Sequence, residues 1–328
     1  MKSPFDHTEL LSLLQGRAAI TSLDIGARGE IKNDLDALAP FVNVVGFEPD
    51  EQVCLSLNAR DWSATRWRSV RFISAALGRD HAEETLYSTY AGGTSSLYRP
   101  LPDAGQIYSR SDYYHLKEGV PLCVSPLDEV LAAHGVPTAD HIKLDVEGYE
   151  LEVLAGARNT LPQVTVLRIE VSFVPMRERQ PLYYDLGAFL DEAGFAPFEF
   201  VELHHWRNST KVKYPERSEG AIPFSKGQMI HGDLLFYRKA ETLDFSSDHG
   251  VQRAVRYGLI ALCYGHVDHC AMLFKRPEVL QWINDNGITR SILEGELSRV
   301  SKNLYKAYRR AKLKELARVL RGLATRAS

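Results

Sequence analysis

The chain has 328 residues, 45% of them hydrophobic, which is enough for a full core and excludes collagen-like and low-complexity classes. The formal net charge of −3 conceals an asymmetry, because residues 299–328 hold ten Lys and Arg and one acid, a net of +9. Residues 1–298 are therefore at −12 (29 basic, 41 acidic), and so acidic a body argues against a general nucleic-acid binder.

Short apolar runs alternate with helical patterns through the first 200 residues, which predicts a parallel sheet with helices on both faces. The last two strands have no convincing helix between them, so we expect the sheet to close with an antiparallel strand. The predicted strands are 19–26, 42–50, 69–78, 141–148, 164–172, 197–205 and 229–238, with helices at 51–59, 149–157 and 182–195.

Two polar segments, 83–123 and 206–228, interrupt this alternation near strand ends, where open α/β sheets bind ligands. From about residue 249 the pattern is helical. We therefore predict two domains, an α/β domain at 1–240 and a helical extension at 241–328 that ends in a basic amphipathic helix.

The N-terminal residues and the cysteines bear on location. Neither the first 17 residues nor the longest later apolar run, 257–265, meets the length needed for a secretory signal or a membrane span. Four irregularly spaced cysteines are typical of a reducing compartment. These features predict a cytoplasmic protein.

The first strand runs into a glycine turn, "LDIGARGE", where backbone N–H groups can approach a ligand. Glu48 ends the second strand, 22 residues after Gly26, where nucleotide-binding folds place an acid for ribose hydroxyls. An ordinary βα turn and a surface acid are the alternatives. Together the two features favour a cofactor that contains ribose.

Several segments, above all "KLDVEGYELEVLAGA" at 143–157 and "GFEPD" at 46–50, resemble the FkbM family of S-adenosylmethionine (SAM)-dependent methyltransferases. The resemblance covers about residues 18–239. It implies a Rossmann-like, doubly wound, seven-stranded sheet whose last strand is antiparallel. It also implies O-methylation of a sugar, a polysaccharide or a secondary metabolite, with SAM as the methyl donor.

The resemblance also assigns cofactor-binding residues to positions of this chain, which are expected to contact the methionine portion, the ribose, the adenine and the sulfonium of SAM in turn. The family's commoner first motif has Asn and another residue where Arg28 and Gly29 stand, so this chain departs from the family pattern directly after Ala27. The assigned residues are Asp24, Gly26 and Ala27 (methionine portion), Glu48 (ribose), Ala75 and Ala76 (adenine), and Asp145 (sulfonium).

A methyl transferase of this kind needs no metal in principle, and we predict none. It needs an aligned acceptor and a base for the hydroxyl proton. We expect Asp145 in the active site, whereas Glu147 is interpreted as starting the following helix, with contact to substrate or metal as its alternative. His204 and His205 are candidate bases, with exposed loop histidines as the alternative. Glu170 is a candidate for holding the acceptor, with an ion pair to a neighbour such as Arg177 as the alternative.

Two clusters remain. Tyr108, Tyr113, Tyr114 and Arg110 form either an acceptor lid or a packed surface loop. Cys263, His266 and Cys270 would share one face of a helix and could bind metal, but their apolar neighbours favour an ordinary buried helix.

The basic segment 299–328 has leucines and tyrosines at near-helical spacing, which is typical of helices on anionic membranes. A solvated or oligomer-packing helix and a nucleic-acid contact are the alternatives, the second disfavoured. The leading hypothesis is a SAM-dependent O-methyltransferase of polysaccharide biosynthesis, cytoplasmic or peripheral to the inner membrane face. The alternatives are a methyltransferase of secondary metabolites or RNA, and a non-catalytic SAM-binding module.

Overall fold

The computed structural model describes residues 9–17, 19–26, 31, 34–91, 93–136, 139–210 and 226–324, with side chains up to residue 314. The chain divides into two compact units: a sheet unit, 20–33 and 42–242, and a helical unit, 1–19, 34–41 and 243–328. The predicted boundary near residue 240 lies close to Leu243, but the helical unit also includes two segments from the first 41 residues.

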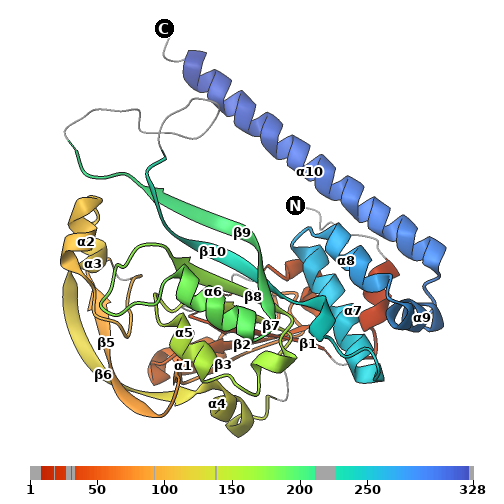
Figure 1. Cartoon of the computed structure of the whole chain (residues 1–328), viewed down its shortest axis with the longest axis horizontal. Coiled ribbons are helices and arrows are strands. Elements are labelled where there is room, and N and C mark those ends of the chain that lie inside the picture. Colours follow the sequence, from red (N-terminus) through yellow and green to blue (C-terminus); the bar gives the residue numbers. More distant parts are fainter. Residues whose placement is uncertain are drawn as a thin grey trace. The chain divides into compact units, whose positions relative to one another are not determined.

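A seven-stranded sheet forms the centre of the sheet unit (Figure 1). Strand β10 is antiparallel to both of its neighbours, and the β1–β2, β2–β3, β1–β7 and β7–β8 pairs are parallel. This confirms the predicted fold with its reversed last strand. The strands, in spatial order, are β3 (Ser69–Ile73), β2 (Val42–Phe47), β1 (Ile20–Ile25), β7 (His141–Leu144), β8 (Val166–Ser172), β10 (Gln228–Arg238) and β9 (Phe195–Trp206).

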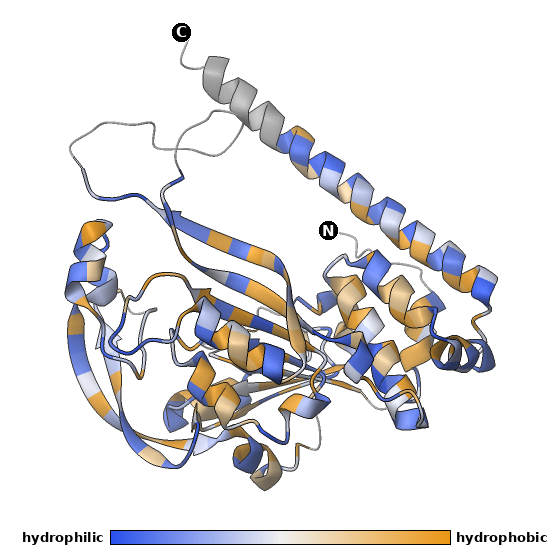
Figure 2. Cartoon of the chain, in the orientation of Figure 1, coloured by the Kyte–Doolittle hydropathy of each residue, from blue (hydrophilic) through white to orange (hydrophobic). Residues whose placement is uncertain are grey.

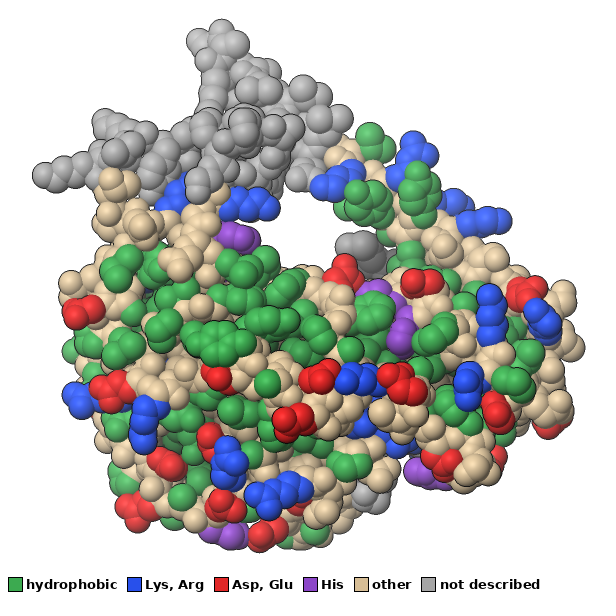
Figure 3. Space-filling model, viewed as in Figure 1, with side chains coloured by type: hydrophobic (Ala, Val, Ile, Leu, Met, Phe, Trp, Pro, Cys, Tyr) green, Lys and Arg blue, Asp and Glu red, His purple; other side chains and the backbone are tan. Residues whose placement is uncertain are grey.

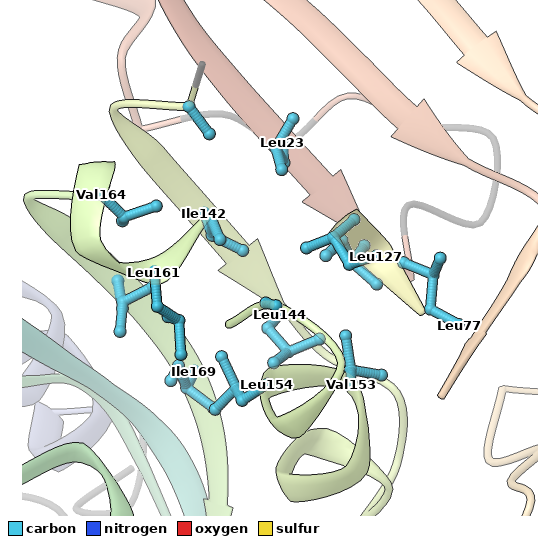
Figure 4. Packing of buried hydrophobic residues seen from close by; sticks show 14 of the residues in the cluster. Leu23, Leu77, Leu127, Ile142, Leu144, Val153, Leu154, Leu161, Val164 and Ile169 are labelled. Atoms are coloured by element: carbon cyan, nitrogen blue, oxygen red, sulfur yellow. The ribbon is translucent and has the colours of Figure 1, made fainter. Parts of the chain in front are cut away.

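The core of the sheet unit is built on the buried residues of its central strands. All six residues of β1 are buried, as expected for a parallel strand covered on both faces. Figure 4 shows Leu144 of β7 and Ile169 of β8 close to Leu154, which lies on a covering helix, and Leu23 of β1 and Ile142 of β7 belong to the same buried cluster. The helices of this unit that pack into the same core are α4 (Leu127–Ala133), α5 (Glu150–Ala155) and α6 (Tyr183–Glu192).

A second, three-stranded sheet corrects two predictions. The predicted strand 69–78 is two strands in different sheets, and the predicted polar segment 83–123 contains two long strands. Gly119 and Pro121 within β6 and its mostly exposed residues explain why the pattern resembled a loop. The elements are β4 (Ala76–Gly78), β5 (Ala82–Thr89), β6 (Leu116–Pro126), α2 (Pro102–Ile107) and α3 (Ser111–Tyr114), while α1 (Glu51–Asn58) follows β2 of the large sheet.

The helical unit corrects the hypothesis of one helix carrying a cysteine and histidine face. Cys263 ends α7, whereas Cys270 lies within α8, and Cys270 is fully buried. His269 pairs with the Tyr257 hydroxyl at 2.8 Å. The elements of this unit are η1 (Glu9–Leu14), η2 (Asp36–Phe41), α7 (Asp248–Cys263), α8 (Val267–Phe274), α9 (Pro277–Asp285) and α10 (Arg290–Ala324).

Among the helices that the structure describes, none has the length and apolar content required to cross a bilayer. Two short 3₁₀ turns complete the sheet unit. They are η3 (Leu161–Gln163) and η4 (Ala240–Thr242).

Candidate active site

A pocket of about 430 Å³ lies where the parallel strands of the large sheet end. Open α/β sheets bind ligands at this edge, and the volume suits a small molecule. Five of the predicted cofactor residues line the pocket: Gly26, Glu48, Ala75, Ala76 and Asp145. Asp24 is not among the lining residues, and Ala27 lies outside the described residues.

Glu48 is held at the end of β2 by the backbone on either side of it. Its own N–H donates to the carbonyl of Ile73 at 3.1 Å, and its Oε1 accepts the N–H of Asp50 at 3.0 Å. Asp50 in turn caps α1 by accepting the N–H of Val53 at 3.0 Å. The Glu48 carboxylate is therefore fixed at the pocket, whose lining also includes the apolar Leu77.

Gly26 is required where β1 and β7 end side by side. The Asp145 N–H donates to the Ile25 carbonyl at 3.0 Å, which draws the two strand ends together. Gly26 has a φ of +90°, and a Cβ on it would lie 1.8 Å from the carbonyl oxygen of Asp145. Only glycine fits this close approach of two backbones.

We predict that Gly26→Ala lowers the free energy of unfolding much more than Gly135→Ala does. Gly135 also has a positive φ, of +62°, but a Cβ added to it would meet nothing within 4 Å, so it isolates the cost of left-handed backbone, about 1–2 kcal/mol. Gly26→Ala adds a clash with backbone that cannot move aside. Chemical denaturation of both variants measures the difference, and equal losses would contradict the close approach.

Asp24 lies beneath the pocket rather than in its wall. Its side chain is 1% exposed, and Lys143 Nζ lies 3.5 Å from its Oδ1 and 3.7 Å from Oδ2 of Asp145. Burial raises the pKa of Asp24 to about 6, and the charge of Lys143 opposes this rise. Lys143, which the sequence analysis did not single out, thus links the two acids.

Three carboxylates gather at the Asp145 end of the pocket. One oxygen each of Asp145, Glu147 and Glu170 lies within 4.8 Å of the others. Arg177, which is 4% exposed, donates from Nη2 to Glu147 Oε2 at 2.6 Å and to the Thr94 carbonyl at 3.3 Å. For the ion pair expected as the alternative role of Glu170, only the named partner is wrong: Arg177 pairs with Glu147, and Glu170 pairs with His231.

The interpretation of Glu147 as the residue that starts the helix is also wrong. Glu147 lines the pocket with a φ of +58°, while Glu150 takes the role at the start of α5. Glu150 Oε1 accepts the N–H groups of Val146 and Gly148, both at 3.0 Å. Burial, followed by the charge of Glu170, raises the pKa of Glu150 to about 8.

His231 is the residue that the sequence analysis missed. Because β10 runs antiparallel, its first residues lie at the carboxyl ends of the parallel strands, where His231 pairs with Ser172. Its Nδ1 is 2.8 Å from Glu170 Oε1. Burial lowers the pKa of His231, but the hydrogen bond and charge of Glu170 outweigh it and raise that pKa overall.

Glu170 and His204 flank His231. Burial, the charge of Glu147 and that of Asp145 raise the pKa of Glu170 to about 7 against the hydrogen bond from His231. The ring of His204 stacks on that of His231 with centroids 4.5 Å apart, and burial, followed by His231, lowers its pKa. Glu170 and His204, which were both named from the sequence, thus contact His231.

An aromatic group extends this row of residues toward solvent. Trp206 meets His231 edge-on at 5.6 Å and Tyr113 at 6.3 Å, and the Arg110 guanidinium lies 5.1 Å above the Trp206 ring. Tyr108 and Tyr114 are instead buried, at 8% and 5% exposure. The expected lid thus reduces to Tyr113 and Arg110, and the other two tyrosines are core.

The three clustered carboxylates have a spacing that could hold a metal ion. Arg177 and His231 already pair with two of them, which lowers the negative charge left for a cation. The prediction that no metal is needed stays a prediction.

Comparison with known proteins finds a family model that matches part of the chain. The methyltransferase FkbM domain matches residues 36–197, just under half of the chain. No curated protein matches the sequence.

Some solved structures are similar at low identity. A precorrin-6y C5,15-methyltransferase from Geobacter metallireducens GS-15 is 11% identical with a TM-score of 0.34, covering 70% of this chain and 86% of that one. The 23S rRNA methyltransferase ErmE is 12% identical with a TM-score of 0.31, covering 89% and 94%. An rRNA methylase from Streptococcus thermophilus is 11% identical with a TM-score of 0.29, covering 73% and 98%.

Proposed function

Because the chain belongs to the methyltransferase FkbM family through its domain at 36–197, we propose that it transfers a methyl group from SAM to a hydroxyl of a sugar or polysaccharide. One observation carries the proposal: a single pocket at the carboxyl ends of the strands is lined by Glu48 and by Asp145 and Glu147. Acids at these positions suit a ribose and a cationic sulfonium.

The residues of the pocket fit SAM by their chemistry. Glu48 would accept hydrogen bonds from the ribose hydroxyls, and Ala75, Ala76 and Leu77 offer an apolar wall for the adenine. Asp145 and Glu147 would favour a positive charge at their end of the pocket. When bound, SAM supplies a methyl group that its sulfonium charge already activates.

His231 is the base in this proposal. With Glu170 accepting from Nδ1–H, the imidazole is held in the tautomer whose Nε2 is free to take a proton from an acceptor hydroxyl. Glu170 therefore acts as a positioning residue for His231, as a carboxylate orients histidine in other enzymes. The tautomer is assigned here from the hydrogen bond.

Trp206 and Tyr113 support a sugar as the acceptor. Both rings lie on the His231 side of the site, and Tyr113 is 37% exposed. Aromatic faces suit the apolar faces of sugar rings, and Arg110 adds hydrogen-bond donors beside them. The net charge of −12 over residues 1–298 weighs against RNA as the acceptor.

Calorimetry with SAM tests the proposal at Glu48. We predict that wild type binds SAM and that Glu48→Gln weakens binding by about 10–100-fold, as expected for the loss of a hydrogen bond to a charged group. Glu51→Gln is the matched control, because it removes the same charge from α1 outside the pocket lining.

Two results would contradict this. A wild-type protein that does not bind SAM would exclude a SAM-dependent enzyme, and equal weakening in both variants would show a general charge effect rather than a ribose contact. Transfer of labelled methyl groups to polysaccharide and to total RNA, measured side by side, then separates the proposed acceptor from the alternative.

A further inference from the structure

The C-terminal part of α10 leaves the core of the helical unit. Leu293, Leu297 and Val300 are buried, at 4%, 8% and 0% exposure, but every side chain from Tyr305 to Lys314 is exposed. The helix nevertheless continues to Ala324. In proteins most helical stability comes from packing of an amphipathic face, so this segment is expected to gain stability from a surface that covers it.

The exposed segment is strongly basic. Residues 305–314 contain five Lys and Arg and no Asp or Glu, and Figure 3 shows Lys and Arg side chains along the part of this helix drawn in colour. Arg299 pairs with Glu296 one turn earlier, before the exposed part begins. Such a concentration of positive charge is complementary to an anionic surface.

Apolar side chains interrupt this charge. Tyr305, Tyr308 and Leu313 are 61%, 59% and 60% exposed, and Figure 2 shows hydrophobic positions between the hydrophilic ones along α10. Tyrosine is enriched where protein meets the membrane interface, because its ring is amphipathic. A purely electrostatic contact would not require these residues to face solvent.

We propose that the exposed part of α10, residues 305–314, binds the surface of an anionic lipid membrane. The basic residues would bind lipid headgroups, and Tyr305, Tyr308 and Leu313 would enter the boundary between headgroups and acyl chains. Pairing with a second copy of this helix is disfavoured, because each helix carries the same positive charge. The contact is interfacial and would bring the enzyme to acceptors held at a membrane.

Flotation of the full chain with vesicles tests this proposal without reference to methyl transfer. The protein should float with vesicles of phosphatidylcholine and phosphatidylglycerol, not with pure phosphatidylcholine, and less at high salt. Lys306→Gln, Arg309→Gln and Arg310→Gln combined should weaken binding roughly 100-fold, since each basic residue contributes about 1 kcal/mol. Tyr305→Ser with Leu313→Ser should weaken binding while keeping its salt dependence.

The matched control combines Arg66→Gln, Lys117→Gln and Arg158→Gln, three exposed basic residues of the sheet unit. This variant should float like wild type, with circular dichroism confirming that all variants fold. Flotation of the α10 variant equal to wild type, or loss in both triple variants, would overturn the proposal. Displacement of wild type from vesicles by low concentrations of double-stranded RNA would equally overturn it in favour of nucleic acid.

Discussion

Replacing His231 by glutamine should lower kcat by about 10²–10⁴-fold while leaving the affinity for SAM unchanged. The loss of kcat is expected because His231 pairs with Glu170 at 2.8 Å and stacks on His204, as the proposed base. The affinity for SAM should stay unchanged because His231 is not among the residues that line the pocket. Single-turnover methyl transfer and calorimetry with SAM measure the two quantities separately.

His205→Gln is the control for this prediction. His205 lies on the neighbouring strand β9, opposite Met229, and no described contact joins it to Glu170. It should retain wild-type kcat. If His204→Gln lost the activity and His231→Gln kept it, the base would be His204 instead.

The pH dependence gives a second readout of the pair. His231 must be neutral to accept a proton, and the charge of Glu170 raises the pKa of His231. Because the pKa of Glu170 is itself raised to about 7, the pair holds a proton at acid pH and kcat should fall as pH drops below about 7. In Glu170→Gln the charge is gone, so the fall should move to lower pH.

The parts of the fold that the sequence predicts are those that depend on local pattern. Strands β1, β7 and β8 are short, largely buried segments rich in Ile, Leu and Val, and such segments can be recognised in the sequence. Strand β6 is mostly exposed and contains Gly119 and Pro121, so its pairing with β5 depends on partners distant in sequence. The sequence pattern alone could not show this pairing.

The site residues also differ in whether the local sequence pattern predicts them. Glu48 and Asp145 were predictable because each follows a parallel strand, and the carboxyl ends of parallel strands meet at one edge. His231 begins an antiparallel strand, so it reaches the same edge from the opposite direction, and only the reversed strand order signals it. Glu147 precedes Gly148 and Glu150 follows it by two residues, and the backbone turn at Gly148 decides which one caps and which one faces the pocket.

A large effect on stability is expected at Arg177. Arg177→Met should lower the free energy of unfolding by about 3–5 kcal/mol, because it leaves Glu147 without its buried partner beside Asp145 and Glu170. Arg179→Met is the control: Arg179 is exposed two residues away, and its loss should cost less than about 0.5 kcal/mol.

A double-mutant cycle separates the ion pair from simple packing at Arg177. Glu147→Gln removes the charge that Arg177 neutralises, so the double variant should recover part of the loss, with a coupling of about 0.5–3 kcal/mol. SAM affinity should fall together with the free energy of unfolding. Arg177 also donates to the Thr94 carbonyl, and Ser96, which lines the pocket, donates to the Glu147 carbonyl at 2.8 Å. Additive losses in chemical denaturation would mean that Arg177 stabilises this edge through its contact with Tyr114 and not through Glu147.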